Sequence, residues 1–364
     1  MGRAKKVTYL VGDFETTVYE GQINTEVWAS AVVEMYTEDV HILHSLKETF
    51  DYLKGLKTNV VIFYHNLKFD GTFWLDFLMK TLRFRQALVE DTDDPFAVEF
   101  KKDKDMLSGE FKYSISDMGQ WYTIKIKTGH YMIEIRDSLK LLPFSVKQIG
   151  KGFSTKHRKL DMEYTGFRYA GCVISEDEKE YIANDVLVVK EALEFMFDSG
   201  HDKLTIASCC MNEYKSICKK SIKNQLQFNE MFPNVYEIEA PIEFPERTAG
   251  DWIRKSYKGG WCYLARGKEN IEYEEGVTAD VNSLYPSMMS SESGNRYPIG
   301  KPCFWWGDYI PEDAIAPNKY YFIRIKTRFY IKEGYLPCIQ IKGNALYKAT
   351  EWLDSSDFID SETG

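Results

Sequence analysis

The sequence predicts an α/β fold around a mixed sheet, and three patterns support this prediction. Apolar runs of strand length recur early in the chain, near residues 7–14, 26–35, 40–44 and 59–63. Helical patterns occupy the neighbouring stretches 45–55 and 69–82. Residues 121–136 alternate between apolar and polar side chains, which predicts a β-hairpin.

A long helix is predicted directly after Ser175, because Ser175 and Glu178 have the spacing of a capping box. Apolar residues then recur at intervals of three and four and form one buried stripe, namely Ile182, Val186, Val189, Leu193 and Met196. Tyr181 and Asp185 share the edge beside this stripe, one turn apart. From about residue 200 to 250 the pattern is helical and basic and then acquires prolines.

Composition limits the class of protein. A chain of 364 residues with 44% hydrophobic and 28% charged side chains is globular rather than disordered, and it is long enough for two or three domains. Seven cysteines without a repeated Cys-x-x-Cys spacing indicate neither a disulfide scaffold nor a zinc site, so we expect a reducing cytoplasm. No segment is long and apolar enough to span a membrane. The net charge of −9 argues against a simple basic DNA-binding protein, although local patches can still bind nucleic acid.

Three acidic segments predict a metal site. Asp13 and Glu15 are two residues apart in an expected strand, so both carboxylates leave the same face. Adjacent negative charges are unfavourable unless a cation lies between them. Asp70 follows the strand predicted at 59–63, and Asp185 borders the buried face of the long helix. Each segment alone is also typical of a solvated turn or an ion pair, but four carboxylates on two strand ends or loops and one helix can together hold two magnesium or manganese ions.

These three segments, in this order, resemble the 3′–5′ exonuclease motifs of family B DNA polymerases, and the middle one is similar to the protein-primed phage subgroup. The segments are Val11–Thr17, Tyr64–Gly71 and Tyr181–Asp185. Residues Ala279–Ser287, with the sequence ADVNSLYPS, resemble the first polymerase motif of the same family. Further matching strings occur in the same order as in the family at Met118–Tyr122, Asp137–Lys140, Tyr257–Gly260 and Leu336–Lys342.

The resemblance implies a ribonuclease H-like 3′–5′ exonuclease domain at residues 1–198, followed by an incomplete family B polymerase palm with an inserted subdomain. The connection and the start of the palm would occupy residues 199–289, and the insertion residues 290–364. In the family this insertion contacts the terminal protein that primes replication. The implied activity is proofreading within a DNA-directed DNA polymerase, in the cytoplasm of a bacterial host if a phage encodes the chain.

The resemblance also implies roles for individual residues. Asp13, Glu15, Asp70 and Asp185 would be the exonuclease metal ligands. Tyr181 would orient the attacking water, and Lys159 would stabilise charge on the scissile phosphate. The residues that match single-strand ligands are Thr16, Asn66, Phe69, Ser138, Leu139 and Tyr164. A loop that contacts DNA would contain Tyr257, Gly259 and Gly260. Asp280 would bind the polymerase metals, and the residues at the incoming nucleotide would be Asp280, Val281 and Tyr285.

Plainer interpretations remain open for several of these residues. Phe69 and Tyr164 are equally typical of core aromatic side chains in a chain with 15% aromatic residues. Lys159 lies in the basic run Lys156–Lys159, which is typical of a solvated loop, and its spacing to Tyr181 is what favours a site. His65 is interpreted as a structural residue.

The second half of a polymerase site is missing from the sequence. After Asp280 the family carries a lysine-containing helix motif and a second metal-binding aspartate motif, and neither occurs between Ser287 and Gly364. We therefore expect the chain to bind single-stranded and primer–template DNA, but to use deoxynucleotides only with a complementary C-terminal chain. Two alternatives stay open, a stand-alone 3′–5′ exonuclease and a noncatalytic subunit of a replication complex, and the full set of carboxylates argues against the second.

Overall fold

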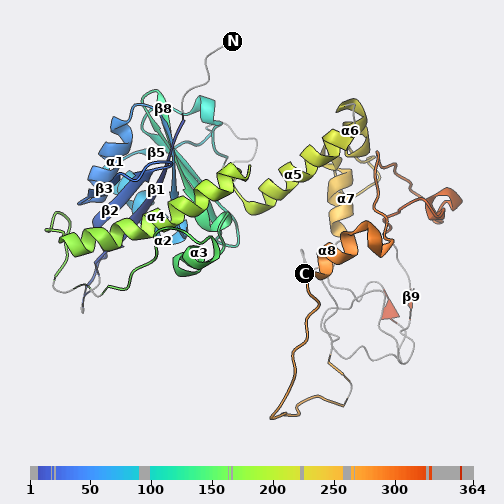
Figure 1. Ribbon diagram of the computed structural model, residues 1–364. Coiled ribbons are helices and arrows are strands. Elements are labelled where there is room, and N and C mark those ends of the chain that lie inside the picture. The colour runs from blue at the N-terminus through green and yellow to red at the C-terminus, as the bar shows by residue number, and fades with distance from the viewer. Residues whose placement is uncertain are drawn as a thin grey trace. The chain divides into compact units, whose positions relative to one another are not determined.

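The computed structural model divides the chain into two compact units, Met1–Ile217 and Cys218–Gly364, and each is considered by itself (Figure 1). The described residues are 7–17, 19, 22–89, 99–162, 164, 167–221, 225–256, 264–265, 267–324, 328–329 and 353–354. No described helix combines the length and the apolar character that a membrane span requires.

Unit 1 contains a mixed sheet whose described strands lie in the order β3–β2–β1–β4–β8–β7–β6–β5. The bounds are β1 Val7–Thr16, β2 Val27–Glu34, β3 Val40–Leu43, β4 Asn59–Tyr64, β5 Arg85–Gln86, β6 Glu110–Ile115, β7 Trp121–Thr128 and β8 Tyr131–Asp137. Strands β1, β4 and β8 are neighbours and run parallel, whereas β2 and β7 each pair antiparallel with both of their neighbours. The four early strands and the hairpin that the sequence predicts are confirmed, and so is the α/β class.

Helices cover both faces of this sheet and create two hydrophobic cores. On one face lie α3 (Val146–Gly152) and α4 (Glu176–Asp198), and α4 crosses in front of the strands in Figure 1. On the other face lie α1 (Leu46–Gly55), α2 (Leu67–Asp76) and the π-helical turn Phe77–Thr81. Strand β1 contributes to both cores because its side chains alternate: Val11 packs toward α4, and Leu10 and Phe14 pack toward α2.

Helix α4 begins as the sequence predicts. Ser175 Oγ accepts a hydrogen bond from the backbone N–H of Glu178 at 3.3 Å, and Glu178 Oε2 accepts one from the backbone N–H of Ser175 at 2.8 Å. Arg168 forms an ion pair with Glu178, which adds a third contact at this end of the helix. The predicted stripe is buried along its whole length, at Ile182, Val186, Val189, Leu193 and Met196.

The helix predicted over residues 69–82 differs from the observed one. Helix α2 starts two residues earlier, at Leu67, and becomes a π-helical turn after Asp76. Its start depends on Asp137, because Asp137 Oδ1 accepts hydrogen bonds from the backbone N–H groups of Asn66 at 3.1 Å and Leu67 at 3.2 Å. The same oxygen accepts from the backbone N–H of Leu139 at 3.0 Å. The buried side chain of Asp137 therefore fixes the start of α2 to the end of β8.

Unit 2 contains shorter elements, which follow α5 (Ile206–Ser221) in the chain. Its described helices include α6 (Gln225–Met231), α7 (Ala249–Lys255) and α8 (Leu284–Met289), and β9 (Arg328–Phe329) pairs with β10 (Leu353–Asp354). The ring of Phe244 is the centre of an aromatic cluster, with centroid distances of 5.1 Å to Trp252, 5.0 Å to Phe304 and 5.5 Å to Trp306. This cluster joins the segment before α7 to residues 304–306.

The first prediction concerns Asp137 as an organiser of unit 1. Asp137→Ala should lower the free energy of unfolding by about 2 to 4 kcal/mol, because three backbone N–H groups lose their acceptor and at least one of them is buried. Urea denaturation measures the change. Asp137→Asn keeps an acceptor oxygen and should retain most of the stability, and the exposed Asp117→Ala serves as a neutral control. Equal stability of Asp137→Ala and the unmodified protein would contradict this role.

Candidate functional site

The ends of the three parallel strands meet at one edge of the sheet, and the predicted acidic residues gather there. Asp13 and Glu15 lie near the end of β1, Asp70 follows the end of β4, and Asp137 is the last residue of β8. Parallel neighbours end at the same sheet edge, which is where ligands bind in open α/β sheets. The topology thus brings together residues that are far apart in the sequence.

Asp13, Glu15 and Asp185 form the centre of this site. One carboxylate oxygen of each residue lies within 4.8 Å of the other two. Asp13 and Glu15 alternate with the residues that pack toward α2, so they leave the face of β1 that is covered by α4, the helix that carries Asp185. Within the part of the chain that the structure describes, these residues are the one group of three potential metal ligands.

Asp70 reaches the site from helix α2, within the stretch 69–82 for which the sequence predicts a helix. It lies in the first turn of α2, because that helix begins directly after Asn66. Its side chain is 2% exposed. Asp70 lies outside the group of three, but its charge raises the pKa of Asp13, so the two carboxyl groups interact. The structure therefore gathers three of the predicted ligands closely and places the fourth beside them.

Burial makes the charged form of these carboxyl groups costly. It raises the pKa of Glu15 to about 7 and that of Asp70 to about 8. The pKa of Asp13 is raised well above its ordinary value, first by burial and then by the charges of Asp70, Glu15 and Asp185. Burial also raises the pKa of Asp185, although its ion pair with Lys159 opposes the rise. Raised pKa values mean that these carboxyl groups ionise readily only when a positive charge lies next to them.

The donor set fits a hard divalent cation. All four side chains offer carboxylate oxygens, which are the ligands that Mg²⁺ and Mn²⁺ prefer. The buried atoms Asp70 Oδ1 and Asp185 Oδ1 have no hydrogen-bond partner among the described residues. A buried polar atom without a partner is costly, and a bound cation would satisfy both oxygens while offsetting the repulsion between the carboxylates.

Lys159 and two tyrosines surround the Asp185 side of the cluster. Lys159 Nζ forms an ion pair with Asp185 and lies 5.4 Å from the centroid of the Tyr181 ring. The Tyr164 ring is 5.9 Å from that of Tyr181, and burial together with the nearby charge of Glu15 raises the pKa of its hydroxyl. Lys159 is therefore part of the acidic cluster and not simply a solvated loop residue. Tyr164 packs against the core and also faces the site.

The residues that match single-strand ligands occupy different environments. Phe69 is 49% exposed at the start of α2, with its ring 5.4 Å from that of Phe73. Ser138 is fully buried, and its hydroxyl donates to the backbone oxygen of Tyr64 at 3.1 Å and lies 3.0 Å from Nδ1 of His65. The Ser138 hydroxyl is thus used within the protein. The exposed or partly exposed members of this set also include Thr16, Asn66 and Leu139.

The predicted polymerase residues do not form a comparable cluster. Asp280, Val281 and Tyr285 are exposed, and Tyr285 lies on α8. Asp280 belongs to no group of three potential metal ligands among the residues with described positions. The predicted loop residues Tyr257, Gly259 and Gly260 lie outside the described residues.

Sequence reasoning selected the string Asp137–Lys140 but gave Asp137 no role of its own. In the structure its carboxylate holds the backbone of Asn66 and Leu139, two of the predicted DNA ligands. The local signal was an acidic residue directly before a short turn, a position where its side chain can accept from the backbone two residues later. The contact with Asn66 had no local signal.

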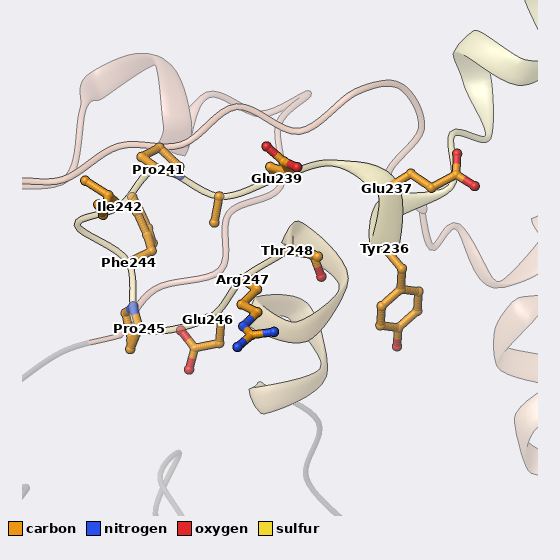
Figure 2. A pocket seen from close by; sticks show the side chains of 11 residues that line it. Tyr236, Glu237, Glu239, Pro241, Ile242, Phe244, Pro245, Glu246, Arg247 and Thr248 are labelled. Carbon is orange, nitrogen blue, oxygen red and sulfur yellow. The ribbon is translucent and has the colours of Figure 1, made fainter. Parts of the chain in front are cut away.

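Unit 2 contains a separate cavity of about 590 Å³, drawn in Figure 2. Its lining residues are Tyr236, Glu237, Glu239, Ala240, Pro241, Ile242, Phe244, Pro245, Glu246, Arg247 and Thr248. Figure 2 shows the chain turning back between Glu239 and Thr248, which pair through an antiparallel bridge. The cavity contains none of the residues that the sequence selected, and its prolines, acids and single arginine form no group of metal ligands.

Comparison with known proteins places this geometry in context. The family model described as DNA polymerase type B, organellar and viral, matches residues 54–175 and 161–356. The DNA polymerase of Bacillus phage Nf is 34% identical over 350 residues, which cover 94% of this chain and 54% of that protein. The DNA polymerase of Streptococcus phage Cp-1 is 30% identical over 349 residues, covering 92% and 53%. The chain thus spans about half the length of the curated relatives it matches.

Solved structures show the same likeness. Phi29 DNA polymerase complexed with primer–template DNA matches with a TM-score of 0.71 and 31% identity, covering 96% of this chain and 56% of that one. The same polymerase complexed with single-stranded DNA matches with a TM-score of 0.65 and 28% identity, covering 95% and 55%. The likeness therefore extends over both units of the chain.

The second prediction concerns the pH dependence of metal stabilisation. The pKa values of Glu15 and Asp70 are raised from 4.5 and 3.8 to about 7 and about 8, so the metal-free folded protein binds these protons more tightly than the unfolded chain. Their stabilising contribution is complete below about pH 4 and is lost as the pH rises through 7 and 8. A divalent cation competes with these protons. The rise in melting temperature on adding Mg²⁺ or Mn²⁺ to protein in EDTA should therefore grow between pH 5 and pH 8.

Differential scanning calorimetry measures this rise. At a concentration about a hundredfold above the dissociation constant, the metal should add about 2.7 kcal/mol of stability. The double variant Asp13→Asn, Glu15→Gln should lose the increment, while the exposed Asp117→Asn should keep it. An increment that does not change with pH would show that these carboxyl groups do not bind the cation.

Proposed function

Because the chain belongs to the organellar and viral type B DNA polymerases, we propose that unit 1 removes nucleotides from the 3′ ends of single-stranded DNA by metal-dependent hydrolysis. One observation carries this proposal, the convergence of Asp13, Glu15 and Asp185 within 4.8 Å of one another. Closely spaced carboxylates that are shielded from water are costly in a purely structural role, and Lys159 forms an ion pair with only one of them, Asp185.

The carboxylates, Lys159 and Tyr181 would have different roles at the phosphodiester bond that is cleaved. Divalent ions held by the four carboxylates would offset the charge of the phosphate and lower the pKa of an attacking water. Lys159 brings a positive charge to the same place and can stabilise the extra negative charge of the transition state. Tyr181 lies one turn before Asp185 on α4, where its hydroxyl can orient the water. The ammonium group of Lys159 lies over the Tyr181 ring, and this cation–π contact keeps the two side chains together.

The strand-end residues provide a surface for the single strand. The half-exposed ring of Phe69 can stack on a base of any identity, and Asn66 and Thr16 offer exposed or partly exposed polar groups. The phi29 polymerase that this chain resembles has been observed with single-stranded DNA and with primer–template DNA, which supports DNA as the substrate class.

We place this activity in the N-terminal part of a protein-primed DNA polymerase. Residues 1–198, which lie within unit 1, then correspond to a ribonuclease H-like exonuclease domain, residues 199–289 to the connection and the start of the palm, and residues 290–364 to an insertion that contacts the terminal protein. The matches with DNA polymerases that are about twice as long support this assignment. The exposed Asp280 and Tyr285 would take part in nucleotide addition where the remaining metal ligand and the triphosphate-binding lysine are also present.

The third prediction tests the nuclease directly. Replacing Asp13 and Glu15 together by Ala should slow Mg²⁺-dependent degradation of a 3′-ended single strand by about a thousandfold or more, because metal activation contributes several kcal/mol to the reaction. Gel analysis of a 5′-labelled oligonucleotide measures the rate. Asp117→Ala is the matched control on the exposed surface. Undiminished degradation by the homogeneous double variant would contradict the assignment of Asp13 and Glu15 to the nuclease site.

The fourth prediction separates the two activities. The chain alone, given primer–template DNA, Mg²⁺ and deoxynucleotides, should shorten primers without extending them. Addition of a C-terminal polymerase polypeptide that carries the missing lysine and aspartate motifs should allow extension. Asp280→Ala should then abolish extension and leave degradation unchanged, because Asp280 belongs to no carboxylate group within the described structure. Primer extension by the purified chain alone would contradict this account.

A further inference from the structure

A second carboxylate on α4, Glu191, holds the loop that carries Lys159. Glu191 Oε2 accepts hydrogen bonds from the backbone N–H groups of Lys156 at 2.5 Å and His157 at 3.4 Å. Glu191 Oε1 lies 2.5 Å from Nδ1 of the His157 ring, which donates to it in the tautomer that carries its proton there. Both side chains are largely shielded, at 15% exposure for Glu191 and 21% for His157. One side chain thus fixes two consecutive residues of the loop.

The beginning of this loop is anchored independently to α3. The backbone N–H of Thr155 donates to the carbonyl of Gly150 at 3.2 Å, and the Thr155 hydroxyl donates to the carbonyl of His157 at 2.8 Å. Thr155 is buried. Ser154 before it has a φ of 52°, a left-handed conformation that is uncommon for a non-glycine residue. The loop therefore has a defined path up to His157.

Helix α4 binds this loop at two levels. Lys159 pairs with Asp185, and six residues further along the helix, about 9 Å along its axis, Glu191 holds Lys156 and His157. Lys159 is only two residues beyond His157. If the backbone of His157 moved, Lys159 would therefore move with it. The Lys156 side chain has a separate role on the surface, because its Nζ pairs with Glu38 at 2.8 Å.

We propose that Glu191 is a positioning residue for the nuclease, which sets the path of the loop so that the Lys159 ammonium group reaches the phosphate beside Asp185. This inference rests on the proposed function. Glu191 itself touches neither the carboxylate cluster nor the place of the substrate. It acts through two backbone N–H groups and one imidazole ring, and a misplacement of about 1 Å at a reacting group can cost about a hundredfold in rate.

Glu194 offers a matched control one turn later on the same helix. Its carboxylate also accepts from a loop backbone, the N–H of Tyr36 at 2.5 Å, and lies 3.4 Å from Nζ of Lys190. Its exposure of 18% is close to that of Glu191. The loop that it holds carries none of the residues of the site. It contacts the Lys159 loop through the exposed ion pair between Glu38 and Lys156, and an exposed pair of this kind contributes little. A change that merely weakens α4 contacts with loops should therefore appear equally in both variants.

The kinetic experiment compares Glu191→Ala, Glu194→Ala, Lys159→Ala and the double variant of Glu191 and Lys159 on a single-stranded oligonucleotide with Mg²⁺. Glu191→Ala should lower kcat by about a hundredfold and change KM by less than about threefold, because the lysine charge matters most in the transition state. Glu194→Ala should keep kcat. The double variant should be no slower than Lys159→Ala, since both changes remove the same contribution.

Two further measurements keep the proposal falsifiable if the alanine variant is unstable. Hydrogen exchange of the peptide covering residues 153–162 should accelerate in Glu191→Ala and stay unchanged in Glu194→Ala. Glu191→Gln retains the side-chain length and an acceptor oxygen, and it should recover kcat to within about tenfold of the unmodified protein.

The outcomes separate this inference from the proposed function. Multiplicative effects of Glu191→Ala and Lys159→Ala on kcat, or unchanged exchange over 153–162 in Glu191→Ala, would overturn the positioning role while the nuclease assignment stands. Absence of Mg²⁺- or Mn²⁺-dependent degradation by the unmodified protein would overturn the proposed function and with it the positioning role. Accelerated exchange would then show only that Glu191 holds a loop.

Discussion

The mutual repulsion of carboxylates at one edge of the sheet is the constraint on which unit 1 depends. Burial raises the pKa of Asp13, Glu15, Asp70 and Asp185, because removal from water disfavours their charged form. At Asp13 the charges of Asp70, Glu15 and Asp185 raise the pKa further. Two hydrophobic cores, one on each face of the sheet, supply the stability that keeps them there. The parallel β1, β4 and β8 in the middle of the sheet decide that the site lies at their common end.

Much of the site and of helix α4 follows from short-range sequence patterns, and the sequence therefore predicts these features. The spacing of Asp13 and Glu15 along a strand needs only the two-residue period of β structure, and the start of α4 needs only Ser175 and Glu178. The buried stripe of α4 follows from the helical period in the same way. Each of these features is encoded within about one or two turns of chain, so a single sequence is sufficient to find it.

Features that depend on contacts between residues far apart in the chain could not be predicted from the sequence. The start of α2, and with it the place of Asp70, is set by an aspartate 70 residues or more further along the chain. The pairing of Lys159 with Asp185 closes a separation of 26 residues, and its basic neighbours suggested a solvated loop. Ser138 is a predicted DNA ligand, and the hydrogen bond from its hydroxyl to the backbone oxygen of Tyr64 had no local signal. In each case a tertiary hydrogen bond or ion pair overrides what the neighbouring residues favour.

The strand order of unit 1 has a consequence for how the chain acquires its fold. Strand β4 lies between β1 and β8, where Val7 pairs with Asn59 and Tyr64 with Asp137, so the central ladders close long loops before they gain contacts. Helix α4, which covers one face, is synthesised after all eight strands. Until it docks, Val11, Val61 and Phe63 on that face lack their cover from this helix. A nascent chain on the ribosome therefore passes through a stage with an open apolar sheet, the kind of surface that chaperones bind and that aggregates when left unprotected.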